Sequence, residues 1–294
     1  MQETMNRNVA LVLSSGGARG FAHIGVINVL EQMGYSITSV AGTSMGALIG
    51  GIYATGQLRQ FEEWVSTLDI REVLRLTDLT ISNKGLVKGK KIIEKMKEIV
   101  PDRNIEDLPI PYCAIATDIL NGSEKVFTEG KLYDAIRASI SIPTVFQPFK
   151  TGGNYYVDGG VVNPIPINRV IRHEGDILIA VSVNANIPYE RKMNDNKKDI
   201  DNKYLKQIRQ LQDKLSNHIP KNKKDAIGIF NLTNRSISIM LGQIALLTLG
   251  NQKIDLTINI SREAFGTYDF YKAKEIILEG ENAARQAIAA YDFS

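Results

Sequence analysis

A serine between two glycines, in the run Gly42-Thr43-Ser44-Met45-Gly46, is the residue of this chain best placed for nucleophilic chemistry. A serine hydroxyl is a weak nucleophile, so an enzyme must expose it on a tight turn, place a base beside it and aim backbone N–H groups at the developing oxyanion. A Gly-x-Ser-x-Gly run between a strand and a helix provides such a turn. The motif therefore predicts acyl transfer with Ser44 as nucleophile and the Met45 amide, at the positive end of the helix dipole, as an oxyanion donor.

A second glycine turn, Gly16-Gly17-Ala18-Arg19-Gly20, lies one strand-helix unit earlier. It lacks the Gly-x-Gly-x-x-Gly spacing and the Lys-Ser/Thr ending of phosphate-binding loops, which disfavours nucleotide binding. Successive amides at Gly16, Gly17 and Ala18 suit a backbone nest for an oxyanion better. Arg19 has two interpretations, which are a charge near an anionic lipid head group and a partner for a surface carboxylate.

The base that would activate Ser44 is less obvious from the residues. The chain has three histidines, His23, His173 and His218, and none of them lies in a recognisable motif. The run Asp158-Gly159-Gly160 follows a strand-like segment, so its carboxylate would project at a strand end and accept the serine proton directly. An ordinary turn is the simpler interpretation of Asp-Gly-Gly on the residues alone.

The elements that would position these residues alternate between strand and helix patterns. Strands are expected at residues 9–13, 39–42, 112–117, 125–128, 154–157, 176–183 and 256–260, and helices at 21–33, 45–54, 90–99 and 132–139. Such alternation predicts a single α/β domain over residues 1–294, built as a sandwich around a mainly parallel sheet.

Two stretches differ from this pattern. Residues 190–225 hold eleven Lys or Arg against six Asp or Glu, a difference of +5, and are expected to form an exposed insertion. Contact with an anionic membrane is the alternative role for that charge. Residues 236–249 are strongly apolar and predict a buried helix or a wall of an acyl pocket.

Composition narrows the remaining possibilities. The chain is 44% hydrophobic and carries a formal net charge of only +3, without zinc-like Cys/His spacing or a basic stripe, so neither nucleic acid nor a metal or other cofactor is expected. The single cysteine, Cys113, is expected to be a core residue rather than a reactive thiol. Neither a signal-peptide pattern nor a membrane-spanning run is found, which makes the cytoplasm the expected location. The oligomeric state does not follow from the sequence.

The motifs together resemble the patatin-like phospholipases. The resemblance rests on the runs Ser15-Gly16-Gly17-Ala18-Arg19-Gly20, His23-Ile24-Gly25, Gly42-Thr43-Ser44-Met45-Gly46, Ser141-Ile142-Pro143, Asp158-Gly159-Gly160 and Asn163-Pro164-Ile165-Pro166. It covers nearly the whole chain apart from the basic insertion, and Ser15 stands where many members have a further glycine. It implies a three-layer patatin-like sandwich, a Ser44–Asp158 dyad without histidine, an oxyanion hole lined by Gly16, Gly17 and Ala18, and calcium-independent hydrolysis of fatty acyl esters in phospholipids or related lipids.

Three other functions remain open. Ser44, Asp158 and either His173 or His218 occur in the chain order of an α/β-hydrolase triad, although that fold usually builds several strands before its nucleophile. A lipid-binding or regulatory protein would hold an acyl chain in the same cleft without cleaving it. An acyltransferase would share the acyl-enzyme and pass its acyl group to an alcohol.

Overall fold

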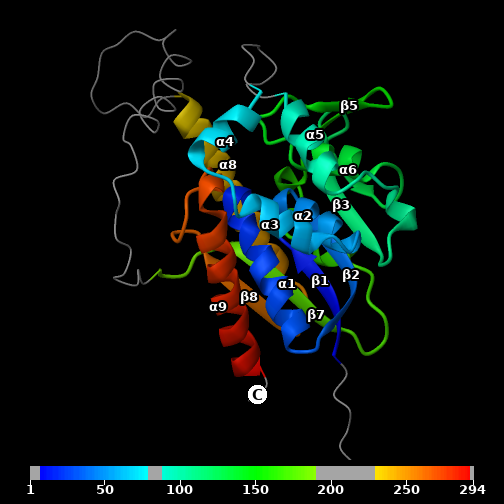
Figure 1. Cartoon of the computed structure of the whole chain (residues 1–294), viewed down its shortest axis with the longest axis vertical. Coiled ribbons are helices and arrows are strands. Elements are labelled where there is room, and N and C mark those ends of the chain that lie inside the picture. Colours follow the sequence, from blue (N-terminus) through cyan, green and yellow to red (C-terminus); the bar gives the residue numbers. More distant parts are fainter. Residues whose placement is uncertain (1–6, 79–87, 190–228, 292–294) are drawn as a thin grey trace, which may run out of the picture.

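A computed structural model describes residues 7–78, 88–189 and 229–291 as an α/β sandwich (Figure 1). Its central sheet has eight strands in the order β5-β6-β3-β2-β1-β7-β8, with β4 pairing beside β3. The strands are β1 (Asn8–Leu13), β2 (Ser36–Thr43), β3 (Tyr112–Asp118), β4 (Ser123–Phe127), β5 (Phe149–Thr151), β6 (Asn154–Asp158), β7 (Ile177–Ala185) and β8 (Leu256–Ser261). The expected mainly parallel sheet is confirmed.

The sheet divides into a parallel part and an antiparallel part. The five strands β3, β2, β1, β7 and β8 are parallel, and their apolar runs are buried because the sheet is covered on both faces. Strands β4 and β6 pair antiparallel with β3, and β5 pairs antiparallel with β6. The sequence pattern predicted a mainly parallel sheet and did not separate the two parts.

One face of the sheet carries the larger core. Helices α1 (Ala22–Gln32), α2 (Met45–Ala54), α6 (Leu132–Ser139) and α9 (Ala273–Tyr291) cover this face, and their apolar side chains form one core with alternate side chains of the strands, such as Leu11 and Leu13 of β1. Helices α1 and α9 lie in close contact, because a Cβ atom on Gly25 would lie 2.0 Å from the Ile277 carbonyl oxygen. The layer continues through α3 (Leu58–Val65), α4 (Ile70–Leu76) and α5 (Lys90–Ile99).

The opposite face has a smaller core. Ala10, Val12, Leu178 and Ala180 form a cluster there with Ile165 and Ile167 of the segment that follows β6. Helix α8 (Ile229–Gly250), which follows β7 and precedes β8 in the chain, lies on this face and contributes Ala245 and Leu249 to the edge of the cluster. The result is a three-layer arrangement whose second helical layer is thin.

Most of the expected elements are confirmed, with their ends shifted by up to three residues. The short strand β5 and the helices α3 and α4 were not anticipated. The prediction that residues 236–249 form a buried helix is wrong, because one side of α8 is exposed; the reason is that the thin layer offers it a partner on one side only. The basic insertion lies outside the described residues, and the single-domain assignment stays a prediction. No helix in the described ranges is long and apolar enough to cross a membrane.

Candidate active site

Ser44 occupies a strained turn between β2 and α2. Its backbone has φ 56° and ψ −122°, and within the described ranges only Thr144 shares a positive φ among non-glycine residues. The two motif glycines make the turn possible by close approach. A Cβ atom on Gly42 would lie 2.3 Å from the Gly46 carbonyl oxygen, and one on Gly46 would lie 2.1 Å from the Leu13 carbonyl oxygen.

Strand register brings Asp158 to Ser44. Thr43, the last residue of β2, pairs with Ile115 of β3, so Ser44 lies level with Ala116. Ala116 pairs in turn with Asp158, the last residue of β6. At Ala116 the opposite edge of β3 is occupied by β4, so β6 pairs with the edge along which β2 ends, and its last residue, Asp158, lies against Ser44.

The Ser44 hydroxyl donates a hydrogen bond of 2.5 Å to Oδ2 of Asp158. The Gly160 N–H donates to Oδ1 of the same carboxylate at 2.7 Å, while a Cβ atom on Gly159 would lie 2.1 Å from the Ile115 carbonyl oxygen. Ser44 is 2% exposed and Asp158 is 6% exposed. Serine and carboxylate therefore contact each other directly in a buried place.

Burial raises the pKa of Asp158 to about 6, although the hydrogen bonds from Ser44 and Gly160 favour the ionised form and lower it. A carboxylate with a raised pKa is a stronger proton acceptor than one in water. Near neutral pH it is still ionised. Asp158 is thus suited to take a proton from the hydroxyl that it contacts.

Ser139, at the end of α6, was not singled out by the sequence. The Ser44 N–H donates to its hydroxyl oxygen at 2.8 Å, and that hydroxyl donates to the Ile115 carbonyl at 2.5 Å. Two residues later, the Ser141 carbonyl accepts from the Asp158 N–H at 2.9 Å. One short segment therefore holds the backbones of both candidate catalytic residues. Only the similarity of Ser141-Ile142-Pro143 to the family pointed to it.

The glycine turn after β1 packs against the beginning of α2. A Cβ atom on Gly20 would lie 2.3 Å from Cβ of Met45, so the turn and the Ser44 helix are in contact. Within the described ranges, the backbone N–H groups of Gly16, Gly17 and Met45 donate to no protein acceptor. The Ala18 N–H donates to the Thr267 carbonyl at 2.9 Å, so the expectation that it serves as a free oxyanion donor is not supported.

Arg19 braces the glycine turn from inside the fold. Its guanidinium donates to Oδ1 of Asn184 at 2.6 Å and 2.9 Å and to the Phe265 carbonyl at 2.9 Å. Asn184 in turn donates to the Ser15 carbonyl at 2.7 Å. Burial is the largest effect on the Arg19 pKa and lowers it. The Asp269 carboxylate is close enough to raise that pKa without forming an ion pair with Arg19, and the hydrogen bonds of Arg19 go to protein groups of the interior.

The described histidines do not contact Ser44. His23 is fully buried, its Nε2 lies 2.9 Å from the Ser14 carbonyl oxygen, and burial lowers its pKa to about 4. The backbone N–H of His173 donates to Oδ2 of Asp176, which also accepts from the Thr38 hydroxyl near the beginning of β2. Because the strand rises about 3.3 Å per residue, Thr38 lies roughly 20 Å from Ser44, and His173 lies at that end of the strand. His218 lies outside the described residues.

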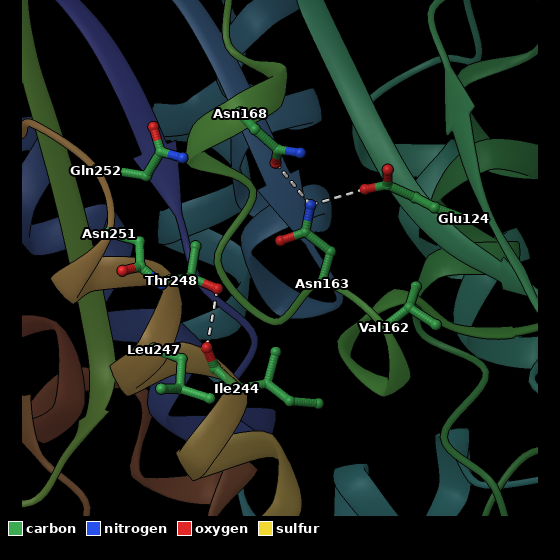
Figure 2. Close-up of a pocket in the computed structure, with 9 residues that line it drawn as sticks. All are labelled: Glu124, Val162, Asn163, Asn168, Ile244, Leu247, Thr248, Asn251 and Gln252. Carbon is green, nitrogen blue, oxygen red and sulfur yellow. Dashed lines mark hydrogen bonds between the residues drawn. The ribbon is translucent and has the colours of Figure 1, made fainter.

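A cavity of about 390 Å³ lies between α8 and the segment after β6 (Figure 2). Its lining combines amides and a carboxylate with aliphatic side chains, which are Glu124, Val162, Asn163, Asn168, Ile244, Leu247, Thr248, Asn251 and Gln252. Asn163 donates to both Glu124 and Asn168, and its carbonyl accepts from the Thr43 hydroxyl at 2.8 Å. Ser44 and Asp158 do not line this cavity. The end of α8 thus forms the wall of a pocket that adjoins the strand of the nucleophile.

Cys113 behaves as the sequence predicted. It is buried in β3 beside Ala41 and Ile115, and burial raises the pKa of its thiol to about 12. A thiol with so high a pKa is a poor nucleophile, because the reactive form is the thiolate. The confirmed prediction leaves Ser44 as the candidate nucleophile of this region.

Comparison with known proteins places the chain first in a class, the lipid-hydrolysing esterases, and then in a family. It belongs to the patatin-like phospholipase family, whose model matches residues 11–171, as the motifs predicted. Uncharacterised NTE family proteins of Mycobacterium bovis and Mycobacterium tuberculosis are 34% identical to it, over 97% of this chain and 92% of theirs. Patatin-like phospholipase domain-containing protein 7 of Rattus norvegicus is 33% identical over 60% of this chain and 14% of its own length. VipD from Legionella pneumophila, a solved structure, matches 98% of this chain and 67% of its own with a TM-score of 0.49 and 13% identity.

Proposed function

We propose that this protein hydrolyses fatty acyl esters of phospholipids or related lipids through a Ser44–Asp158 dyad. The observation that carries the proposal is the direct hydrogen bond of 2.5 Å between the Ser44 hydroxyl and the buried Asp158 carboxylate. Family membership supports a lipid hydrolase, and the contact supplies the pair of groups that such a reaction needs.

Acylation begins with Ser44 Oγ attacking the ester carbonyl carbon while its proton passes to Asp158. The carbonyl oxygen becomes an oxyanion, which the free N–H groups of Gly16, Gly17 and Met45 stabilise. The tetrahedral intermediate then collapses, the bond to the alcohol breaks, and Asp158 returns the proton to the leaving alkoxide. The product is an acyl-Ser44 ester and a free alcohol, such as a lysophospholipid.

Deacylation repeats these steps with water. Asp158 takes a proton from a water molecule as its oxygen attacks the acyl-Ser44 carbonyl, and the same amides hold the second oxyanion. When the intermediate collapses, Ser44 Oγ regains the proton from Asp158 and a fatty acid leaves. An alcohol in place of water would give transfer instead of hydrolysis.

Covalent labelling tests the nucleophile. Incubation of the purified chain with a fluorophosphonate should give a single adduct at Ser44, read by peptide mass spectrometry, and Ser44→Ala should give none. Failure of the folded wild-type protein to label would favour a lipid-binding protein over an enzyme.

Kinetics test the base and the substrate class. A panel of phospholipids, lysophospholipids and soluble short-chain esters, assayed with the wild type, Ser44→Ala and Asp158→Asn, should show turnover by the wild type only, with kcat lowered about a thousandfold or more in both variants. His173→Ala and His218→Ala are matched controls that should retain turnover. Loss of activity in either histidine variant, with Asp158→Asn still active, would replace the dyad with a triad.

A further inference from the structure

One side of α8 exposes apolar side chains along its length. Leu232, Ile239, Met240, Leu246 and Leu247 are between 53% and 65% exposed, and are called the α8 stripe below. Successive members are seven, one, six and one residues apart, and with 3.6 residues per turn this spacing places them on one side of the helix. The only charged residue among the 22 of α8 is Arg235.

Other surface helices of the molecule present charges to water. The exposed side of α3 carries the ion pair Arg59–Glu63, and that of α5 carries Lys95–Glu98. Scattered exposed apolar residues are normal in proteins, but a row of five on one helix is a feature of interaction surfaces. The α8 stripe is therefore unlike an ordinary solvated helix face.

The opposite side of α8 faces the protein and is partly buried. Ala245 and Leu249 pack against the smaller core cluster, while Ile244, Leu247 and Thr248 line the 390 Å³ cavity. Leu247 belongs to both the stripe and the cavity wall, and Figure 2 shows it beside Ile244 at the end of the cavity away from Asn168. The stripe is thus continuous with a pocket close to the end of β2, just before Ser44.

We propose that the α8 stripe docks the protein onto the surface of a phospholipid bilayer. This inference rests on the proposed function, since a lipid hydrolase must meet its substrate in an aggregate. A helix of 22 residues is about 33 Å long, enough to lie flat and bury its five apolar side chains among the lipid head groups and upper acyl chains.

Charge selects a bilayer with anionic lipids as the occupant. No acidic residue occurs in α8, Arg235 suits a phosphate, and residues 190–225 before the helix carry a sequence charge difference of +5. Each basic residue near an anionic surface adds to the attraction, and the effect weakens with salt. A second copy of this chain would bring another Arg235 to the stripe and no acidic residue of α8 to pair with it.

Vesicle binding tests the proposal. The probes are vesicles of phosphatidylcholine alone and of phosphatidylcholine with phosphatidylglycerol at about two to one, and bound protein is measured by flotation. The double variant Ile239→Glu/Leu246→Glu should bind the anionic vesicles about tenfold or more weakly than the wild type. Leu278→Glu, which replaces an equally exposed leucine (56%) on α9, should bind as the wild type does. Equal binding by the double variant and the wild type would overturn the proposal.

A fluorescent label provides a second measurement that needs no acidic substitution. Ile239→Cys labelled with an environment-sensitive NBD group should brighten and shift to the blue on mixing with anionic vesicles, whereas labelled Leu278→Cys should not. The native Cys113 is buried and should give little background. An unchanged signal at position 239 would count against docking. A wild-type dimer in sedimentation velocity that the double variant abolishes, with vesicle binding intact, would assign the stripe to self-association and overturn the proposal.

Activity on a soluble ester separates this inference from the proposed function. The double variant should cleave a short-chain ester at the wild-type rate and lose activity only on vesicles. Ser44→Ala should bind vesicles normally without turnover. If the wild type binds vesicles but cleaves no ester, the proposed function fails while docking stands; if it cleaves soluble ester and ignores vesicles, docking fails alone.

Discussion

Helices α2 and α8 are both rich in aliphatic and small residues and contain no acidic residue, yet they relate to the protein in opposite ways. Almost every residue of α2 is buried; its first turn packs against the backbone of β1, and the Ser139 hydroxyl at the end of α6 accepts from the Ser44 N–H just before it. Helix α8 has a protein partner on one side only. The difference shows that apolar composition alone does not tell whether a helix is buried. The protein itself covers α2, whereas the exposed apolar side of α8 is left for a partner outside the chain.

The largest expected effect is a difference in stability between glycine-to-alanine substitutions on the two helices. Gly46→Ala would force a Cβ atom to within 2.1 Å of the Leu13 carbonyl oxygen, so β1 or α2 must move. We expect the free energy of unfolding to fall by about 3 kcal/mol or more. Urea denaturation followed by circular dichroism measures it.

Gly242→Ala is the matched control on α8. A Cβ atom there meets no other atom within 4 Å, and alanine favours the helix, so we expect stability to rise by about 0.5–1 kcal/mol. Equal losses in the two variants would mean that α8 is packed as tightly as α2, and the contrast would disappear.

The second-largest expected effect concerns Asp158, a buried carboxylate of the candidate active site, whereas α8 contains no acidic residue. The folded-state pKa of Asp158 is raised from 3.8 to about 6, so its contribution to stability is fully present below pH 3.8 and is lost as pH rises through 6. Asp158→Asn cannot ionise and escapes this loss. Relative to the wild type, we expect the variant to gain on the order of 2 kcal/mol between pH 4 and pH 7, measured by denaturation at both pH values.

Asp118→Asn is the control of opposite sign. The hydrogen bond from the Asn121 side chain is the largest effect on the Asp118 pKa and lowers it, so this carboxylate stabilises the fold above its unfolded pKa and Asp118→Asn should lose stability at pH 7.

In the wild type, kcat/KM on a soluble ester should fall as pH drops through about 6, because protonated Asp158 cannot accept a proton. A flat profile across this range would exclude Asp158 as the base.

The sequence identified the features that depend on local pattern. The strands and helices follow from periodicity, and Ser44 follows from a glycine motif at a strand end. At Asp158 the residues alone favoured an ordinary turn, and the family resemblance identified it as the base. That the two residues meet depends on the antiparallel pairing of β6 with β3, which the pattern at Asp158 does not specify. The family resemblance, not the spacing, paired them.

The features that the sequence missed depend on contacts between distant segments. Ser139 carries no motif, and its position between Ser44 and Ile115 exists only once α6 packs on the sheet. The engagement of the Ala18 amide depends on Thr267, far along the chain. Likewise, the apolar pattern of residues 236–249 indicates a helix but not how many of its sides find a partner.

The smallest expected effect tests how the protein holds its nucleophile. Ser139→Ala leaves the Ser44 N–H and the Ile115 carbonyl buried without their present partner, so the strained turn should relax and misplace Ser44 Oγ. We expect kcat on a soluble ester to fall about tenfold, because a small displacement of a reacting atom is costly. KM and the midpoint of the pH profile should not change, since the contacts of Asp158 remain.

Two comparisons decide whether Ser139 positions the nucleophile or only supports the fold. Ser139→Thr keeps the hydroxyl and should restore part of the lost rate, while Ser236→Ala, on the exposed side of α8, should leave both stability and rate unchanged. The rate of fluorophosphonate labelling reports directly on Ser44, without substrate binding. If Ser139→Ala lowers the melting temperature but labels as fast as the wild type, the turn holds its shape without this hydroxyl, and the glycine contacts at Gly42 and Gly46 suffice to set it.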